Sequence, residues 1–271
     1  MRRWLRGRSA SPRTEARHVL VHYHIFKNAG TSIDVCLQRS FGNRWASYEK
    51  AKGDYWTDST NLTTSDMLQR FAEQADLRAI SSHMARWPPP TTDEIQAHPI
   101  VFLRHPIDRV GSVYTYRRKI RGPEAVDRTL AEYVDWLLGP DGNIAVRSFQ
   151  TLFLSDDTHI VNDGGPKSEV NPNHYKQAVL RLEGLPVFGL VEHFGESVQR
   201  MQAWLTPFVP ELDLQSIPAN ESEGRATLMA QRIRDLADAL GQERYDRLVR
   251  ANEADFDLFE HASRLFNHQS V

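Results

Sequence analysis

The run of residues 22–33 combines the residue types that bind phosphate groups in proteins. Its sequence is HYHIFKNAGTSI, with one lysine, one glycine and two hydroxyl residues close together. Lys27 supplies a mobile positive charge, and the hydroxyls of Thr31 and Ser32 can donate hydrogen bonds to anionic oxygens. Gly30 lets the backbone approach such an oxygen, because glycine has no Cβ. This combination predicts an anion-binding loop.

The residues on either side predict a strand before this loop and a helix after it. The apolar run 19–25 is typical of a buried strand, and Ile33, Cys36 and Leu37 follow at the spacing of one helix face. The first N–H groups of a helix lack partners within the helix, and the helix dipole favours an anion at that end. An ordinary strand–helix turn capped by Thr31 would show the same pattern, so both interpretations stay open.

The order of the residues differs from that of a Walker phosphate loop. A Walker loop has the pattern G-x-x-x-x-G-K-[ST], in which the lysine directly precedes the hydroxyl residue. Here Lys27 stands four residues before Thr31, and no glycine precedes it within the run. The loop is therefore predicted to hold a phosphate group in a different way.

A second candidate anion site follows the apolar run 100–103. Arg104 comes directly after this predicted strand, and Pro106 opens a predicted helix that carries Ser112 two turns on. The planar guanidinium offers paired N–H groups to phosphate oxygens, and the helix hydroxyl adds another donor. An ion pair of Arg104 at the sheet edge and a close helix crossing at Ser112 are the alternative explanations.

His83 is a candidate for acid–base chemistry between these two stretches. It follows the predicted strand 77–80 and the polar pair Ser81 and Ser82, and α/β folds place their sites at such strand ends. An imidazole titrates near neutral pH and can accept a proton from a hydroxyl group. A structural histidine at the end of a strand is the alternative.

Together these stretches resemble the sulfotransferases that use 3′-phosphoadenosine 5′-phosphosulfate (PAPS), in particular those that act on carbohydrates. Residues 24–32 are similar to the family's 5′-phosphosulfate loop, H-I-P-K-T-A-G-T-S, and residues 101–112 are similar to its 3′-phosphate motif, R-D-P-x-x-R-x-x-S. Residues 81–83 resemble the short G-H element that carries the base. The positions that depart from these patterns are Phe26, Asn28, Ser82 and His105.

The resemblance implies a single α/β domain over residues 19–271, with a mostly parallel central sheet flanked by helices, as in P-loop-like sulfotransferases. The motifs lie within residues 19–205, and residues 206–271 are expected to form a C-terminal part with two helices around a break at Gly241. The alternation of strand and helix patterns along the chain independently favours a parallel α/β sheet.

The resemblance also implies an in-line transfer of the sulfuryl group from PAPS to an acceptor hydroxyl, without a metal and with adenosine 3′,5′-bisphosphate (PAP) as product. Lys27 is expected to stabilise the leaving oxygen, and His83 is expected to act as the base. The expected donor-binding residues are Lys27, Asn28, Ala29, Gly30, Thr31, Ser32, Arg104 and Ser112. Arg109 and Arg147 are further candidates for nucleotide or acceptor binding. The expected acceptor is a carbohydrate or glycolipid.

Two other functions stay open. A nucleotide-dependent kinase with a degenerate phosphate loop would also need an anion-binding loop, although the absence of G-K-[ST] in the loop counts against it. A homologue without catalytic activity that binds a nucleotide or a glycan would keep the same residues. A comparison of PAPS binding with ATP binding distinguishes the kinase from the sulfotransferase. A search for turnover distinguishes the non-catalytic homologue from both enzymes.

The composition limits the class of protein. The 271 residues carry a formal net charge of −2, which excludes a generally basic protein that binds nucleic acid. The single cysteine, Cys36, cannot form an internal disulfide, and it fits a reducing cytosol. We therefore expect a cytoplasmic protein.

Two segments are expected to lie outside the packed core. Residues 1–18 contain six arginines and no apolar run, which predicts a flexible basic leader and neither a signal peptide nor a membrane span. Weak attraction of this leader to an anionic membrane surface is the alternative. Residues 41–59 are rich in tyrosine, tryptophan, glycine and charge, which predicts a loop or a lid.

Overall fold

A computed structural model describes residues 16–48, 61–120, 127–139, 146–155, 170–214 and 225–268. The predicted basic leader lies outside these ranges up to residue 15. The predicted loop at residues 41–59 lies outside them from residue 49 onward. All structural statements below concern the described residues.

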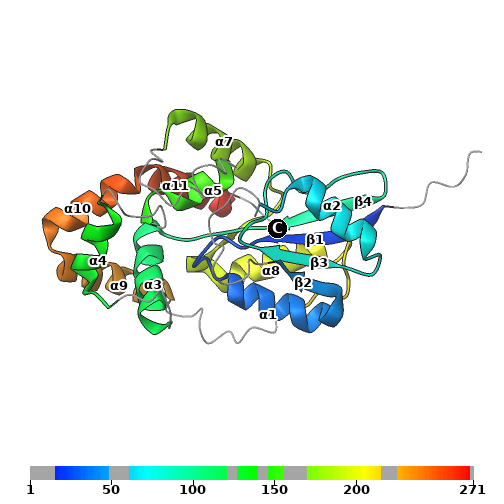
Figure 1. Ribbon diagram of the computed structural model, residues 1–271, viewed down its shortest axis with the longest axis horizontal. Helices are drawn as coiled ribbons and strands as arrows, with labels where there is room; N and C mark the ends of the chain where they lie inside the picture. The colour runs from blue at the N-terminus through cyan, green and yellow to red at the C-terminus, as the bar shows by residue number, and fades with distance from the viewer. Residues whose placement is uncertain are drawn as a thin grey trace, which may run out of the picture.

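The fold is built on a four-stranded sheet with the order β2-β3-β1-β4 (Figure 1). Its strands are β1 (Arg17–Tyr23), β2 (Trp45–Ser47), β3 (Ala79–Ser82) and β4 (Ile95–Ile100), and every pairing among them is parallel. The strand β1 begins at Arg17, so the last two residues assigned to the leader belong to the sheet. All four strands end on the same edge, because parallel strands share their direction.

A second strand pair extends this edge. The chain leaves β4, and β5 (Phe102–Leu103) pairs in parallel with β6 (Gly189–Leu190). The backbone of β6 comes so close to β5 that a Cβ on Gly189 would lie 2.2 Å from the Phe102 ring. The position therefore requires glycine.

The helices α1 (Gly30–Phe41) and α8 (Phe194–Leu205) cover one face of the sheet. Ile33, Cys36 and Leu37 of α1 are fully buried there, as their spacing predicts. Alternate residues of β1 point to opposite faces, so Leu20 packs in this cluster while its neighbours face the other side.

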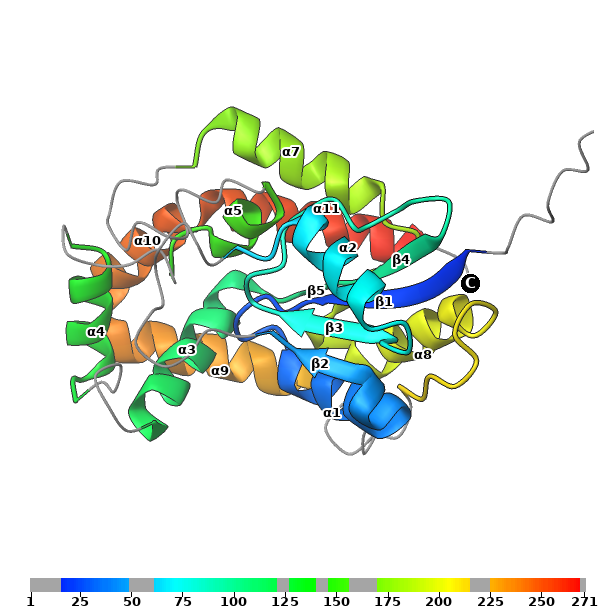
Figure 2. The ribbon, with the colours of Figure 1, turned by 45° about the vertical axis from the view of Figure 1, so that its right-hand side comes forward.

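The other face is covered by α2 (Thr64–Glu73), α5 (Phe149–Ser155), α7 (Pro172–Glu183) and α11 (Glu253–His268). Figure 2 shows α2, α7 and α11 on this side, with α1 and α8 opposite. The apolar cores of both faces are thus closed by helices, which is the arrangement expected for a parallel sheet.

Four further helices form a separate cluster beside the sheet, at the left of Figures 1 and 2. They are α3 (Pro106–Lys119), α4 (Leu130–Leu137), α9 (Arg225–Leu240) and α10 (Gln242–Ala251). Their buried apolar residues make one cluster of their own. Since α3 begins directly after β5, this cluster is tied to the edge where the strands end.

The expectation of a mixed α/β fold with a mostly parallel sheet is confirmed, but two details were wrong. Within residues 41–59, a 3-10 turn (Gly42–Arg44) and the strand β2 occupy positions predicted as loop. The C-terminal part forms three helices, because a second break at Asn252 follows the predicted break at Gly241. Asn252 stabilises that break by donating from Nδ2 to the Val146 carbonyl at 2.6 Å.

Among the described residues, no helix combines the length and the apolar character that a membrane span needs.

Candidate functional site

A cavity of about 230 Å³ lies where β1, β3 and β5 end. It brings together the loop after β1 and the residues that follow β5, which are far apart in the sequence. The described residues that line it are His24, Phe26, Lys27, Ala29, Gly30, Thr31, Ser32, His83, Arg104, Ser112 and Tyr116. Seven of the eight expected donor-binding residues and the expected base are among them.

The loop between β1 and α1 has a special backbone conformation. Lys27 has φ 67° and Ala29 has φ 63°, in the left-handed region that residues other than glycine seldom adopt. Ala29 is the N-cap of α1, and no side chain caps this helix. The alternative of a turn capped by Thr31 is therefore not what the structure has, and Thr31 and Ser32 both line the cavity.

Lys27 presents its ammonium group within a partly buried surrounding. Its Nζ lies 4.6 Å from the centre of the Tyr116 ring, at cation–π distance. Burial lowers the pKa of Lys27, and the nearby charges of Arg104 and Lys119 lower it further. A bound anion would reverse that unfavourable balance by compensating the positive charge.

Arg104 is held in place by its neighbours. Its Nε and NH2 groups lie 2.8 and 2.7 Å from the Asp108 carboxylate, and NH1 donates to the Lys27 carbonyl at 3.0 Å. Arg232 also donates to Asp108, at 2.6 Å. Burial alone would raise the pKa of Asp108, but its bonds to these two arginines hold it below the usual value. A guanidinium has more N–H groups than these contacts use, so Arg104 keeps donors for an anion.

Asn28 was expected to bind the donor, but it is not among the residues that line the cavity. Its side chain is buried and donates at 2.7 Å to both the Phe102 carbonyl and Gln150 Oε1. Gln150 in turn bonds both backbone groups of Arg104, accepting from N at 2.9 Å and donating to O at 2.8 Å. Asp255 accepts from the Gln150 backbone N–H at 3.1 Å. Asn28 and Gln150 thus tie the two halves of the cavity together.

The hydrogen-bond partner of His83 defines its tautomer. Its Nδ1 makes a short contact with the His24 carbonyl, which can only accept, so Nδ1 carries the hydrogen and Nε2 carries the lone pair. Burial lowers the pKa of His83 to about 3, and the adjacent His24 contributes. The imidazole is therefore neutral at physiological pH.

Asp34 of α1 joins two further imidazoles, a role that the sequence reasoning missed. His22 Nδ1 lies 2.8 Å and His24 Nδ1 3.2 Å from its two oxygens, and Ser81 Oγ lies 3.2 Å from His22 Nδ1. Burial opposes ionisation of Asp34, but the contacts with His22 and then His24 hold its pKa far below the usual value.

His22, His24 and Asp34 are residue types that bind metal ions, and their possible ligand atoms lie within 4.8 Å of one another. However, the His22 contact at 2.8 Å is a hydrogen bond, and the His24 contact at 3.2 Å is at ion-pair distance. We therefore interpret the cluster as a carboxylate between two imidazoles. The absence of a metal from the reaction remains a prediction.

The two additional arginine candidates lie away from the cavity lining. Arg109 is fully buried, with its guanidinium 5.0 Å from the centre of the Phe149 ring, and burial lowers its pKa to about 10. Arg147 donates to the carbonyls of Leu137 and Gly139, both at 2.9 Å. Both arginines thus have structural contacts.

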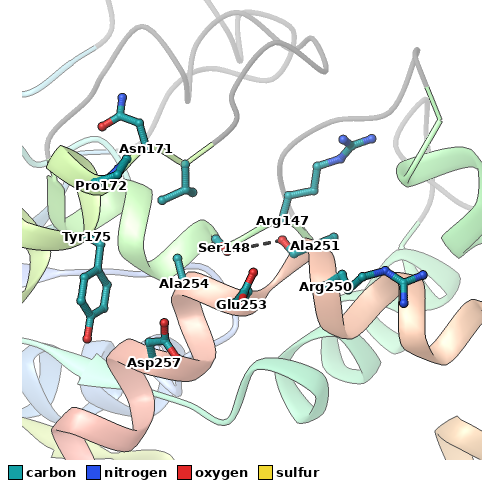
Figure 3. A pocket seen from close by; sticks show the side chains of 11 residues that line it. Arg147, Ser148, Asn171, Pro172, Tyr175, Arg250, Ala251, Glu253, Ala254 and Asp257 are labelled. Carbon is teal, nitrogen blue, oxygen red and sulfur yellow. Dashed lines mark hydrogen bonds between the residues drawn. The ribbon is translucent and has the colours of Figure 1, made fainter.

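Arg147 borders a second, larger cavity of about 680 Å³ between α5, α7 and the junction of α10 with α11 (Figure 3). Its described lining comprises Arg147, Ser148, Val170, Asn171, Pro172, Tyr175, Arg250, Ala251, Glu253, Ala254 and Asp257. Figure 3 shows the charged groups of Arg250, Glu253 and Asp257 spread around it. Lys167, a further candidate to close over the nucleotide because it follows the pair Gly164 and Gly165, lies outside the described residues.

Comparison with known proteins places the chain beside an archaeal relative. No protein-family model matches it. It is 30% identical over 254 residues to an uncharacterized protein of Archaeoglobus fulgidus, and the match covers 90% of this chain and 95% of that protein. The chain therefore belongs to the same protein family as this archaeal protein.

Proposed function

We propose that the protein is a sulfotransferase that moves the sulfuryl group of PAPS to a hydroxyl group of an acceptor. One observation carries the proposal: the phosphosulfate-like loop and the 3′-phosphate-like motif share one cavity. Lys27 and Arg104, 77 positions apart, are joined there by a hydrogen bond. An ordinary strand–helix turn would not need this second cationic group.

Two separate anion contacts favour PAPS over ATP. In the proposed complex, the N-terminus of α1 with Thr31 and Ser32 holds the 5′-phosphosulfate. Arg104 and Ser112 hold the 3′-phosphate, which ATP lacks. The Asp108 carboxylate fixes the Arg104 fork without using all of its donors.

The chemistry then depends on positioning and electrostatics, as in phosphoryl transfer. His83 Nε2 accepts the proton of the acceptor hydroxyl as the oxygen attacks sulfur. Lys27 and the backbone N–H groups at the N-terminus of α1 stabilise the charge that develops on the leaving phosphate oxygen. The neutral state of His83 suits a base, although its low pKa makes it a weak one until the acceptor and the donor are bound.

The proposal includes the finer description of the fold as P-loop-like. It is supported by the parallel order β2-β3-β1-β4 and by the tight loop from the central strand β1 into α1. It also includes a carbohydrate or glycolipid acceptor and a cytoplasmic location, which rest on the resemblance of the motifs and on the single cysteine.

The direct test is binding and turnover with the full-length protein. Titration calorimetry should detect PAP and PAPS binding, with ATP at least tenfold weaker. Incubation with sulfur-labelled PAPS and a panel of glycans, glycolipids and phenols should label one class of acceptor. Tighter binding of ATP, with phosphate transfer, would support the kinase instead. PAP binding without any transfer would support the non-catalytic homologue.

A further inference from the structure

His24 lies between a carboxylate and the cavity. On one side, its Nδ1 is 3.2 Å from Asp34 Oδ2. On the other side, its ring edge rests on Gly30: a Cβ at that position would lie 1.9 Å from His24 Cδ2 and 2.0 Å from Nε2. The glycine thus lets Nε2 reach the N-terminus of α1, where the proposed donor places its phosphosulfate.

The charges around His24 come from several elements. His22 of β1 stacks at 5.1 Å between ring centres, and His83 after β3 lies at 3.9 Å. Asp34 of α1 is the carboxylate in contact, while Lys27 and Arg104 line the same cavity. These two cations and the positive end of the α1 dipole lie on the cavity side of His24, where a bound anion would offset their charge.

The two imidazoles that line the cavity differ in their partners. His24 faces a carboxylate, which stabilises an imidazolium, whereas His83 donates Nδ1–H to a carbonyl oxygen. At 3.9 Å between ring centres, a charge on both rings would be strongly unfavourable. One proton shared by such a pair goes to the ring with the carboxylate partner.

We infer that His24 takes up a proton from solvent when the anionic donor binds. The resulting imidazolium keeps its Nδ1 proton toward Asp34 and donates its Nε2 proton to the phosphosulfate group, while His83 stays neutral as the base. This inference rests on the proposed function. His24 then becomes a second catalytic residue, because it touches the reacting group, and Asp34 becomes its positioning residue. The proton returns to solvent when PAP leaves.

The test measures proton uptake rather than turnover. PAPS is titrated into the full-length protein without acceptor, at one pH, in two buffers with different ionisation enthalpies. The wild-type protein should take up close to one proton more per PAPS than His24→Gln, and the wild-type affinity should therefore fall as the pH rises, by up to about tenfold per pH unit. Asp34→Asn should also lose this uptake. The matched control His83→Gln should retain it, because it removes the neighbouring ring only.

The outcomes separate this inference from the proposed function. Normal PAPS binding with equal uptake in wild type and His24→Gln would overturn the inference alone, as would loss of the uptake in His83→Gln instead. A wild-type protein that does not bind PAPS would overturn the proposed function, and the inference with it. If His24→Gln does not fold, ¹⁵N-histidine spectra of the wild type decide, with the His24 ring signals assigned through their connection to its backbone. A spectrum in which the His24 nitrogens do not change on PAPS addition would contradict it.

Discussion

Two histidine pairs lie at opposite ends of the same sheet. At the carboxyl end, the rings of His24 and His83 are tilted against each other, with 3.9 Å between their centres. At the amino end, His18 Nδ1 lies 2.9 Å from His98 Nε2, and the His98 ring stacks on Phe208 at 4.5 Å. Burial lowers the pKa at both ends, to about 3 for His83 and about 4 for His98, with the partner histidine adding to each shift.

The surroundings distinguish the two pairs. Beside the pair at the carboxyl end are Asp34, Lys27 and a cavity into which both rings face. Beside the pair at the amino end, the described contacts are aromatic, with Phe208 and Trp204. A lowered pKa and a close partner are therefore common to the packed histidine pair and to the pair that we propose to be catalytic. The convergence of charge on an open cavity is what differs.

Removal of the proposed base should have the largest effect. His83→Gln should lower turnover by about 10²- to 10⁴-fold, the usual contribution of a general base, while PAPS binding stays within a few-fold. His98→Gln, the matched change at the other end, should leave turnover unchanged. Initial rates with labelled PAPS measure both. Equal loss in the two variants would mean that the comparison reflects stability only.

Removal of the Lys27 ammonium group should have the second largest effect on turnover. Lys27→Ala should lower turnover by about 10²- to 10³-fold, as expected when one group that stabilises developing charge is removed. The exposed Lys176 of α7 is the matched control, since Lys176→Ala removes a charge far along the chain from the cavity motifs. A near-normal rate for Lys27→Ala would remove this residue from the mechanism.

Arg104 should affect one end of the nucleotide selectively. Arg104→Gln should weaken PAP binding by about 1.5–3 kcal/mol, the range for hydrogen bonds to charged groups, with little change for adenosine 5′-phosphosulfate, which lacks the 3′-phosphate. Arg147→Gln, at the larger cavity, should leave the affinities for both nucleotides unchanged. Calorimetry with the two nucleotides measures the difference. Equal weakening of both would contradict the role of Arg104.

The smallest effect should be on the pH dependence of stability, and it should be similar for His83 and His98 at the two ends of the sheet. The pKa of His83 falls from 6.5 in the unfolded chain to about 3 when folded. The unfolded state therefore binds more protons between these values, and stability is lost as the pH falls from 6.5 toward 3. At pH 5.5 this loss is about 1.4 kcal/mol. Urea unfolding gives the free energy of unfolding at pH 7.5 and at pH 5.5. The difference between these two values should be smaller by about 1.4 kcal/mol in His83→Gln than in the wild type, and by a similar amount in His98→Gln. An unchanged pH effect in both would contradict the burial of their rings.

The sequence predicted the parts of the site that depend on local order. The strand before the loop, the helix after it and the Pro106 helix start each follow from a short pattern, so Lys27, Thr31, Ser32 and Arg104 were found as cavity residues. A parallel sheet brings such strand ends to one edge. That rule needs no knowledge of individual contacts.

The partners of these residues were not predictable in the same way. Gln150 meets Asn28 across 122 positions, and Arg232 meets Asp108 across 124. No short pattern specifies such distant contacts. The one available signal for Gln150 was a polar side chain within the apolar run of α5. Asp34 likewise resembled an ordinary polar residue on the first helix, because only the fold brings two imidazoles to it.

The link from Asn28 through Gln150 to the backbone of Arg104 has a consequence for binding. Buried amide groups join the two halves of the cavity in the protein without ligand. The conformational entropy lost in aligning their donors is therefore lost during folding and not during binding. In the proposed enzyme, this preorganisation would keep the dipoles of the cavity oriented through each catalytic cycle.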